Sequence, residues 1–360
     1  MVPAFAAKSN GQILLRSRGA RREILLNRPE ALNALTLEMI DDMRAVLVAY
    51  AKDPEVGFIV VRGAGERGLC AGGDIRRIYQ SLQSTDDWPG RMWSSEYALN
   101  SYIAKYPKPY VALMDGIVMG GGIGISAHGR YRVVTERTKA AMPEVGIGLI
   151  PDVGATWLLS RAPGETGTCL ALSGMTFGAG DAIYAGLADT YVPSSRLDDM
   201  VGAIAGLEVG NVSALAHCIA SYSGTPPPST LELHRTAIDT CFRHDTIEDM
   251  IVNLDNAGTA FATGLAASLR NNSPTSLKVT LKLLRLARHS TSLEDCLGRE
   301  YSAVLHAAAR ATDLKEGIRA AIIDKDRKPR WSPSEIENVS DSDVAGYLNH
   351  QPSIAIPFVH

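Results

Sequence analysis

Residues 108–126 read KPYVALMDGIVMGGGIGIS, and this stretch carries the pattern that decides the fold class. Its apolar run from Tyr110 to Met114 predicts a buried strand, because strands covered on both faces are almost continuously apolar. Gly120 to Gly122 predict a tight turn, and Ile123 to His128 predict the start of a helix. Residues 131–135 predict the next strand. A strand, glycine loop, helix and strand in succession indicate an α/β core with crossover connections.

The pattern extends toward the N-terminus. Short apolar runs at residues 13–16 and 23–26 predict two strands. Thr36 can cap a helix that runs to Tyr50, since apolar residues recur there at intervals of three and four. The β-branched run at residues 57–61 predicts another buried strand. Residues 74–106 are polar with scattered aromatic side chains and predict a helical segment.

Composition and charge limit the class of protein. The 360 residues are 46% hydrophobic and 21% charged, which is typical of a globular chain and excludes wholesale disorder. With 36 Lys and Arg against 39 Asp and Glu, the net charge is -3, so neither nucleic acid nor a membrane is an expected partner. From residue 196 onward the apolar residues take helical spacing. We therefore expect an α/β core over residues 12–195 and a mainly helical region over residues 196–350.

The cysteines and histidines indicate no covalent or metal scaffold. The five cysteines are widely spread and form no CxxC motif, which favours a reducing cytoplasmic location over a disulfide framework or a zinc site. The opening residues MVPAFAAKSNG are too short and too polar for a signal peptide, and no apolar run is long enough to predict a membrane span. The histidines lack ligand spacing, so we expect no metal.

Two glycine clusters follow predicted strands, AGGD at residues 71–74 and MGGGIG at residues 119–124. Without side chains, such loops can turn backbone N–H groups toward a ligand oxygen, and two converging donors form an oxyanion hole. The alternative is that the glycines only serve tight turns and close packing. Neither cluster completes GxGxxG in a nucleotide-binding unit or GxxxxGK[ST], so the sequence gives little support to NAD or ATP binding.

Two carboxylates lie near these loops in MPEVGIGLIPDVG, residues 142–154. Glu144 and Asp152 each follow a proline and have apolar neighbours, which tend to raise a carboxyl pKa into a range useful for acid–base chemistry. Single acids in loops are more often solvated or act as caps. For Asp152 the specific alternative is a cap of the segment at residues 153–159.

The segment GISAH at residues 124–128 resembles the start of a nucleophile elbow, G-x-S-x-G. Its last residue is His128 and not glycine, and Ser126 falls inside the predicted helix instead of at a strand-to-helix turn. These differences argue against a serine hydrolase. We expect His128 to have a packing or capping role.

Taken together, the motifs carry a family resemblance. LNRPEALNAL, GLCAGGDI, KPYVALMDGIVMGGGIGIS and MPEVGIGLIPDVG resemble the crotonase (enoyl-CoA hydratase/isomerase) superfamily. Within it, the chain most resembles the 3-hydroxyisobutyryl-CoA hydrolases, and the resemblance runs from about residue 12 to 345. It includes the late stretches NSPTSLKVTLKLL and EGIRAAIIDKDRKPRWSP.

This resemblance implies a fold and a set of site residues. The fold is a crotonase-like spiral of ββα units followed by a helical C-terminal region. The backbone N–H groups of Gly73 and Gly121 would hold the thioester carbonyl of an acyl-CoA substrate. The hydrolase pattern further places catalysis or substrate binding at Glu96, Gly121, Glu144 and Asp152. Glu96 taken alone is one acid in a polar helix, and only the resemblance singles it out.

One position departs from the hydratase pattern. Hydratases of this superfamily carry two glutamates, one soon after the GGG motif and one after the later proline. The first of those positions is Gly124 here, and only Glu144 remains. Because hydration needs two groups to hold a water and deliver a proton, the resemblance favours a hydrolase over a hydratase. Asp152 supplies the second acid from a different place.

Three functions stay open on this basis. The first is a thioesterase that acts on a small branched 3-hydroxyacyl-CoA, 3-hydroxyisobutyryl-CoA of valine breakdown. The second is an enoyl-CoA hydratase or isomerase, and the third is a non-catalytic CoA-binding subunit. No cofactor beyond the CoA of the substrate is expected. A basic rim should meet the CoA phosphates, with Arg76 and Arg77 as candidates, and the resemblance implies a homo-oligomer.

Overall fold

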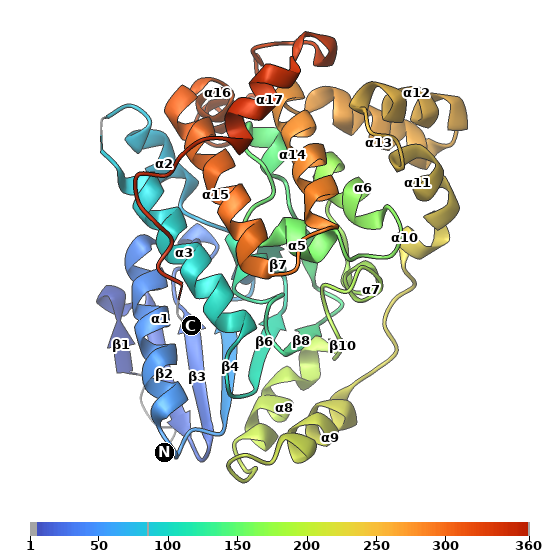
Figure 1. Cartoon of the computed structure of the whole chain (residues 1–360). Helices are drawn as coiled ribbons and strands as arrows, with labels where there is room; N and C mark the ends of the chain where they lie inside the picture. The colour runs from blue at the N-terminus through green and yellow to red at the C-terminus, as the bar shows by residue number, and fades with distance from the viewer. Residues whose placement is uncertain (1–5, 85, 359–360) are drawn as a thin grey trace.

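The computed structural model describes residues 6–84 and 86–358, so the first five residues of the opening stretch lie outside it. Its strands form two sheets (Figure 1). The larger sheet has the order β1 (Ala6–Lys8), β2 (Ile13–Arg18), β3 (Arg21–Leu26), β4 (Phe58–Gly63), β6 (Tyr110–Met114), β8 (Tyr131–Val134) and β10 (Thr190–Tyr191). The smaller sheet has the order β5 (Gly68–Cys70), β7 (Ile117–Met119) and β9 (Lys139–Ala141).

Three successive chain segments each give one strand to each sheet. β4 and β5, β6 and β7, and β8 and β9 follow one another directly, and β4, β6 and β8 are parallel neighbours, as are β5, β7 and β9. In the larger sheet Val60 is paired with Val111, and in the smaller one Val118 is paired with Ala140. This repetition is the crotonase-like spiral, and it confirms the fold class expected from the motifs.

The larger sheet is covered on both faces, which explains its apolar strands. In β4, Ile59 and Val61 belong to the main core, whereas Phe58 and Val60 face a second core. This second core is closed by α8 (Leu197–Ile204) and α9 (Val212–Tyr222). Because successive side chains of a strand point to opposite faces, one short run serves both cores.

The helices of the spiral connect and cover the strands. They are α1 (Leu37–Lys52), α2 (Ile75–Ser81), α3 (Trp88–Ala104), α4 (Gly121–Gly124), α5 (Ala155–Leu159), α6 (Thr166–Ser173) and α7 (Ala179–Tyr184). Thr36 caps α1 as expected, since its hydroxyl oxygen accepts the N–H of Met39 at 3.2 Å. The helix expected to start at Ile123 is only the single turn α4, which already begins at Gly121 and ends before Ser126.

The rest of the described chain after α9 is mainly helical. It contains α10 (Thr230–Leu233), α11 (Arg235–Phe242), α12 (Ile247–Ala257), α13 (Ala260–Asn271), α14 (Pro274–Ala287), α15 (Leu293–Arg310), α16 (Thr312–Ile318) and α17 (Asp341–Leu348). Figure 1 shows α14 and α15 in front of the spiral, with α15 beside α3, and the two helices pack on α5 and α3 respectively. The C-terminal helices therefore pack against helices of the spiral.

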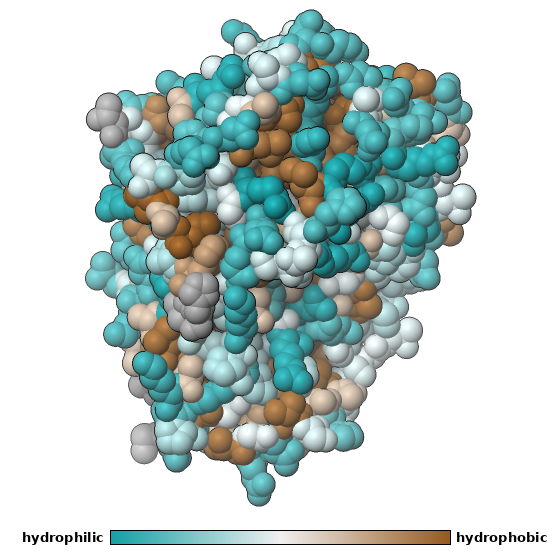
Figure 2. Space-filling model, in the orientation of Figure 1, coloured by the Kyte–Doolittle hydropathy of each residue, from teal (hydrophilic) through white to brown (hydrophobic). Residues whose placement is uncertain are grey.

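The surface in this orientation is mainly hydrophilic, with apolar patches that are small and separate (Figure 2). Within residues 6–84 and 86–358, no helix has both the length and the apolar character that a membrane span needs.

Candidate active site

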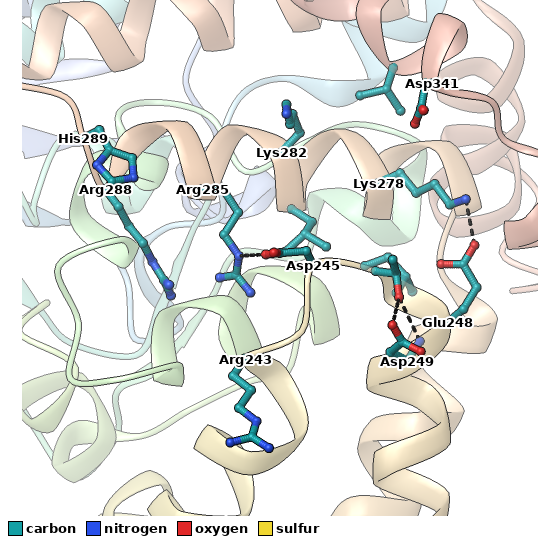
Figure 3. A pocket seen from close by; sticks show the side chains of 14 residues that line it. Arg243, Asp245, Glu248, Asp249, Lys278, Lys282, Arg285, Arg288, His289 and Asp341 are labelled. Atoms are coloured by element: carbon teal, nitrogen blue, oxygen red, sulfur yellow. Dashed lines mark hydrogen bonds and ion pairs between the residues drawn. The ribbon is translucent and has the colours of Figure 1, made fainter.

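A groove of about 810 Å³ lies between α12, α14 and α17 (Figure 3). Its lining mixes both signs of charge, as Lys278 pairs with Glu248 at 2.7 Å and Arg285 pairs with Asp245 at 3.1 Å. None of the residues singled out from the sequence lies in it. The groove therefore offers neither a one-signed cluster nor the expected chemistry.

A much smaller cavity of about 80 Å³ gathers the residues expected from the sequence. Both glycine loops and all three candidate acids line it, and the rest of its wall is mostly apolar. The predicted members of this wall are Gly73, Glu96, Gly121, Glu144 and Asp152. Tertiary structure thus brings together residues from four separate segments of the chain.

The N–H groups of Gly73 and Gly121 are available to a ligand oxygen, because neither donates a hydrogen bond within the described residues. The residue before each of them has a positive φ, +104° at Gly72 and +48° at Gly120, which glycine adopts without strain. A β-carbon placed on Gly72 would lie 3.6 Å from the Gly121 nitrogen. The two loops are therefore close neighbours, as an oxyanion hole requires.

Glu144 opens the 3₁₀ turn η3 (Glu144–Ile147), which follows β9. A β-carbon placed on Gly120 would lie 2.8 Å from Glu144 Oε1, so the carboxylate reaches the second glycine loop. The residue is 7% exposed, and its Oε2 has no hydrogen-bond partner. Burial, and then the charge of Asp152, raises the pKa of Glu144 well above 4.5. Such a group is a strong base or nucleophile once it is ionised.

Asp152 lies between η3 and α5 and is 5% exposed. Its Oδ2 accepts the hydroxyl of Tyr97 at 2.6 Å. Burial raises the pKa of Asp152 to about 6, while the Tyr97 bond opposes the rise. The alternative role as a helix cap is wrong, because Gly154 is the N-cap of α5 and Asp152 contributes only its backbone carbonyl to the N–H of Ala155.

Glu96 comes from the middle of α3, which is mostly buried and not the polar helix expected from the sequence. The helix is buried because it packs between α1 and α15. Glu96 is 2% exposed, its Oε1 has no partner, and a β-carbon on Gly121 would collide with that oxygen. Burial, and then Asp152, raises its pKa well above 4.5. The carboxyl group of Glu96 thus lies beside Gly121, one of the two glycines expected to form the oxyanion hole.

Comparison with known proteins places this site in a family. The family model of enoyl-CoA hydratase/isomerase matches residues 21–348. The chain belongs to the enoyl-CoA hydratase/isomerase family. It is 37% identical over 352 residues to the human mitochondrial 3-hydroxyisobutyryl-CoA hydrolase, covering 96% of this chain and 91% of that protein. It is 36% identical over 355 residues to 3-hydroxyisobutyryl-CoA hydrolase 1 of Arabidopsis thaliana, covering 96% and 93%.

Solved structures of the family show the same fold over almost the whole chain. A carnitinyl-CoA dehydratase from Mycobacterium thermoresistibile superposes with a TM-score of 0.91 and 42% identity, covering 97% of this chain and 99% of that one. An enoyl-CoA hydratase from Rhodobacter sphaeroides superposes with a TM-score of 0.87 and 39% identity, covering 94% and 97%.

Within this family, the Gly124 position separates the site from the two-glutamate pattern. A β-carbon on Gly124 would lie 2.8 Å from both the Nδ2 of Asn100 and the Cβ of Val153, where something must shift. Asn100 and Val153 therefore occupy the space that a side chain at residue 124 would need. The missing carboxylate at residue 124 is thus accompanied by neighbouring side chains that fill its space.

The serine hydrolase alternative is contradicted by the structure. Ser126 follows α4, is fully buried and donates its hydroxyl to the Gly122 carbonyl at 2.6 Å. His128 does not approach it; its Nε2 bonds to the Val153 carbonyl at 2.8 Å. Burial lowers the pKa of His128 to about 4, so the neutral ring donates to that carbonyl. The expected packing role of His128 is confirmed.

The two candidate basic residues of the rim differ in their surroundings. Arg77 is held by Ser81 and Asp86, both at 2.8 Å, and its guanidinium lies over the Trp88 ring. Arg76 is exposed on α2, and its side chain makes no hydrogen bond or ion pair within the described residues. Of the pair, only Arg76 can meet a phosphate without first giving up an existing partner.

No sequence pattern pointed to two site residues on α3, Tyr97 and Asn100. Tyr97 contacts Asp152 directly, and Asn100 fills the space beside Gly124. The spacing of Glu96 and Asn100 by four residues puts them on one helix face, which is the only local signal that links them. Their partners lie far away in the chain, so the sequence alone could not show the contact.

Proposed function

We propose that the chain hydrolyses the thioester of a small branched 3-hydroxyacyl-CoA, 3-hydroxyisobutyryl-CoA, and releases CoA and the free acid. The observation that carries this proposal is the joint burial of Glu96, Glu144 and Asp152 in one cavity beside the free N–H groups of Gly73 and Gly121. Relatives named 3-hydroxyisobutyryl-CoA hydrolase, matched over nearly their full length, support the same activity.

In this proposal the thioester carbonyl oxygen accepts the N–H groups of Gly73 and Gly121. As the carbonyl carbon is attacked, negative charge develops on that oxygen, and the two donors stabilise it without reorganising. The backbone therefore supplies the electrophilic assistance, and we propose that the reaction uses no cofactor and no metal ion.

Glu144 is the group proposed to start the reaction, by one of two routes. In the covalent route, its carboxylate attacks the carbonyl carbon, the C–S bond breaks, the thiolate of CoA takes a proton, and water then cleaves the mixed anhydride. In the general-base route, Glu144 takes a proton from the water that attacks. A single turnover in heavy-oxygen water separates them, because only an anhydride can leave label in the peptide that contains Glu144.

The other two acids have supporting parts in the proposal. Asp152, with a pKa of about 6, is largely ionised at neutral pH and can orient the water or accept its proton. Burial, and then the charge of Asp152, raises the pKa of Glu96 well above its ordinary value, and in its protonated form Glu96 can donate to the hydroxyl of the acyl group. This arrangement favours a substrate with a polar group near the thioester.

Release of thiol from 3-hydroxyisobutyryl-CoA by the purified protein is the direct test. Crotonyl-CoA is the comparison substrate, since loss of its double-bond absorbance would reveal hydration. We expect thiol release to be far faster than hydration, because Asn100 and Val153 fill the place of the second glutamate. Hydration at an equal rate would contradict the proposal, and binding without turnover of either substrate would leave a CoA-binding subunit.

Four wider assignments accompany the activity. We propose that the enzyme acts in valine breakdown, that it forms a homo-oligomer, and that it is cytoplasmic, with Arg76 as a contact of the CoA phosphates. The five cysteines are all free thiols, which suits a reducing compartment. Several related hydrolases are named mitochondrial, so cell fractionation is the measurement that decides location. Light scattering measures the assembly.

A further inference from the structure

A buried carboxylate on α15, outside the cavity, contacts the loop that follows Asp152. Glu300 is fully buried, and its Oε2 accepts the N–H of Gly154 at 2.7 Å. Its Oε1 accepts both the N–H of Thr156 at 2.9 Å and the hydroxyl of Thr156 at 2.5 Å. These partners begin two residues after Asp152. A side chain of the C-terminal region therefore fixes the chain that carries a candidate catalytic acid.

The three groups around Glu300 suit a carboxyl group, which accepts all three when it is ionised and, when it is protonated, can donate to the Thr156 hydroxyl. All three partners of Glu300 can donate, and an ionised carboxylate is the side chain that offers acceptors on both oxygens and no donor. A glutamine would turn an NH₂ group toward either Gly154 or Thr156, where a donor already points at it. Burial raises the pKa of Glu300 to about 8, and the three donors oppose that rise.

The loop needs such a restraint because its backbone is unusual. Val153 has a φ of +55°, a region that β-branched residues rarely adopt, and Gly154 follows with a φ of +80°. Conformations of this kind persist only where the surroundings hold them in place. Glu300 holds one side of this turn, and His128 holds the Val153 carbonyl from the other.

The next residue of α15, Tyr301, contacts the side chain that donates a hydrogen bond to Asp152. The ring of Tyr301 packs edge-on against the ring of Tyr97, with centroids 5.9 Å apart, and the Tyr97 hydroxyl is the hydrogen-bond donor to Asp152. Two consecutive residues of α15 thus contact the surroundings of Asp152. Glu300 holds the backbone that leads into α5, and Tyr301 packs against Tyr97, the donor to Asp152. Both belong to a helix that contributes no residue to the wall of the cavity.

We propose that Glu300 is a positioning residue, which holds the turn at residues 153–156 so that Asp152 faces Glu144 and Glu96 across the cavity. This inference rests on the proposed thioesterase function for its kinetic consequence, though not for its structural one. Helix α15 would then contribute to turnover without contacting the substrate. Glu300 would act by holding the backbone next to Asp152.

The test compares Glu300→Gln with a matched control, Asp181→Asn. Asp181 is also a buried acid that accepts one hydroxyl, from Ser229 at 2.7 Å, and one backbone N–H, from Leu231 at 2.9 Å, but it lies away from the cavity. We expect kcat for thiol release to fall about tenfold to a hundredfold in Glu300→Gln, as for a misplaced catalytic group, with KM changed less than about threefold. Asp181→Asn should keep the wild-type kcat even if it lowers the melting temperature.

A second variant covers the case in which Glu300→Gln fails to fold. Thr156→Val keeps the size of the side chain and removes only the hydroxyl donor to Glu300. Its kcat should fall by a smaller factor, again without a matching change in KM. If the residues act as a unit, the double variant should lose little more kcat than Glu300→Gln alone.

Amide hydrogen exchange provides a readout that does not use turnover. In Glu300→Gln the amides of Gly154 and Thr156 should exchange faster than in the wild type, while they should be unchanged in Asp181→Asn. Unchanged exchange at both amides, or a kcat within twofold of wild type, would overturn the positioning role. A wild-type protein that releases no thiol would instead contradict the proposed function, whatever the exchange data show.

Discussion

The hydroxyl of Tyr97 donates a 2.6 Å hydrogen bond to Oδ2 of Asp152, across 55 residues of sequence. Tyr97 follows Glu96 directly in α3. One helix therefore contributes both a candidate acid and the hydrogen-bond donor to a second acid, Asp152. The bond favours the charged form of Asp152 and opposes the effect of burial on its pKa. The three acids of the cavity therefore differ in their environment, because among them only Asp152 accepts a hydrogen bond from a side chain of the described residues.

Removing this donor should move the pH dependence of turnover. Tyr97→Phe takes away the bond that stabilises the carboxylate, so the pKa of Asp152 should rise above about 6. If ionised Asp152 is needed, the acid limb of kcat against pH should shift to higher pH. Tyr106→Phe, which loses only a 2.9 Å bond to the Leu47 carbonyl, is the control and should leave the limb in place. A limb that moves in neither variant would exclude Asp152 as the titrating group.

Glu144→Gln should separate chemistry from binding. The change keeps the shape of the side chain but removes the reactive carboxylate, so kcat should fall at least about a hundredfold. Affinity for the acyl-CoA, measured by calorimetry, should change little because the glycine loops and the CoA contacts remain. Glu55→Gln, at an exposed loop position, should behave as wild type. Near-normal hydrolysis by folded Glu144→Gln protein would remove the central assignment.

The same variant should be more stable than wild type at alkaline pH. Because the folded pKa of Glu144 lies well above 4.5, the folded state holds a proton that the unfolded chain releases more readily. That stabilisation is complete below the unfolded pKa and is lost as pH rises through the folded pKa, at about 1.4 kcal/mol for each unit between the two. Melting temperatures of wild type and Glu144→Gln should therefore converge near pH 4 and diverge by pH 9.

The oxyanion hole can be probed at Gly121. Gly121→Pro removes the N–H that is proposed to bind the carbonyl oxygen, a loss of roughly 2.7–4 kcal/mol of transition-state stabilisation for one donor. Single-turnover rates should fall accordingly. Because Gly121 begins α4 and touches Glu96, Gly121→Ala is the companion variant. It keeps the N–H and reports the cost of displacing Glu96 alone, so the ratio of the two rates isolates the donor.

Packing at Gly124 should resist conversion into the two-glutamate pattern. Gly124→Ala puts a methyl group against Asn100 and Val153 and should lower the free energy of unfolding by about 1–3 kcal/mol. Gly264→Ala is the control on the exposed side of α13, where a β-carbon meets nothing within 4 Å, and it should gain about 0.5–1 kcal/mol. Thermal unfolding measures both, and a neutral Gly124→Ala would show that the space is free.

Local sequence patterns predict the secondary structure correctly where it depends on residues that are close together in the chain. The strands β4, β6 and β8 follow from short apolar runs, and the start of α1 follows from Thr36 and its spacing. These features depend on residues within a few positions of one another. For residues 74–106 the local pattern predicts the helix but not its burial. The helical prediction for this segment is confirmed by α2 and α3, but α3 is not a polar helix, because it is buried between α1 and α15, which a local pattern cannot show.

The sequence by itself determined which residues could perform the chemistry: the glycines that leave the N–H groups of Gly73 and Gly121 uncovered, the acids Glu144 and Asp152 in apolar loops, and the missing acid at residue 124. The tertiary structure decided their states. Tyr97 from α3 sets the environment of Asp152, Asn100 closes the space at Gly124, and Glu300 from α15 holds the turn after Asp152. The reason is physical: a side chain's type is local, whereas its pKa, its partners and its free space depend on segments that only folding brings within a few ångströms.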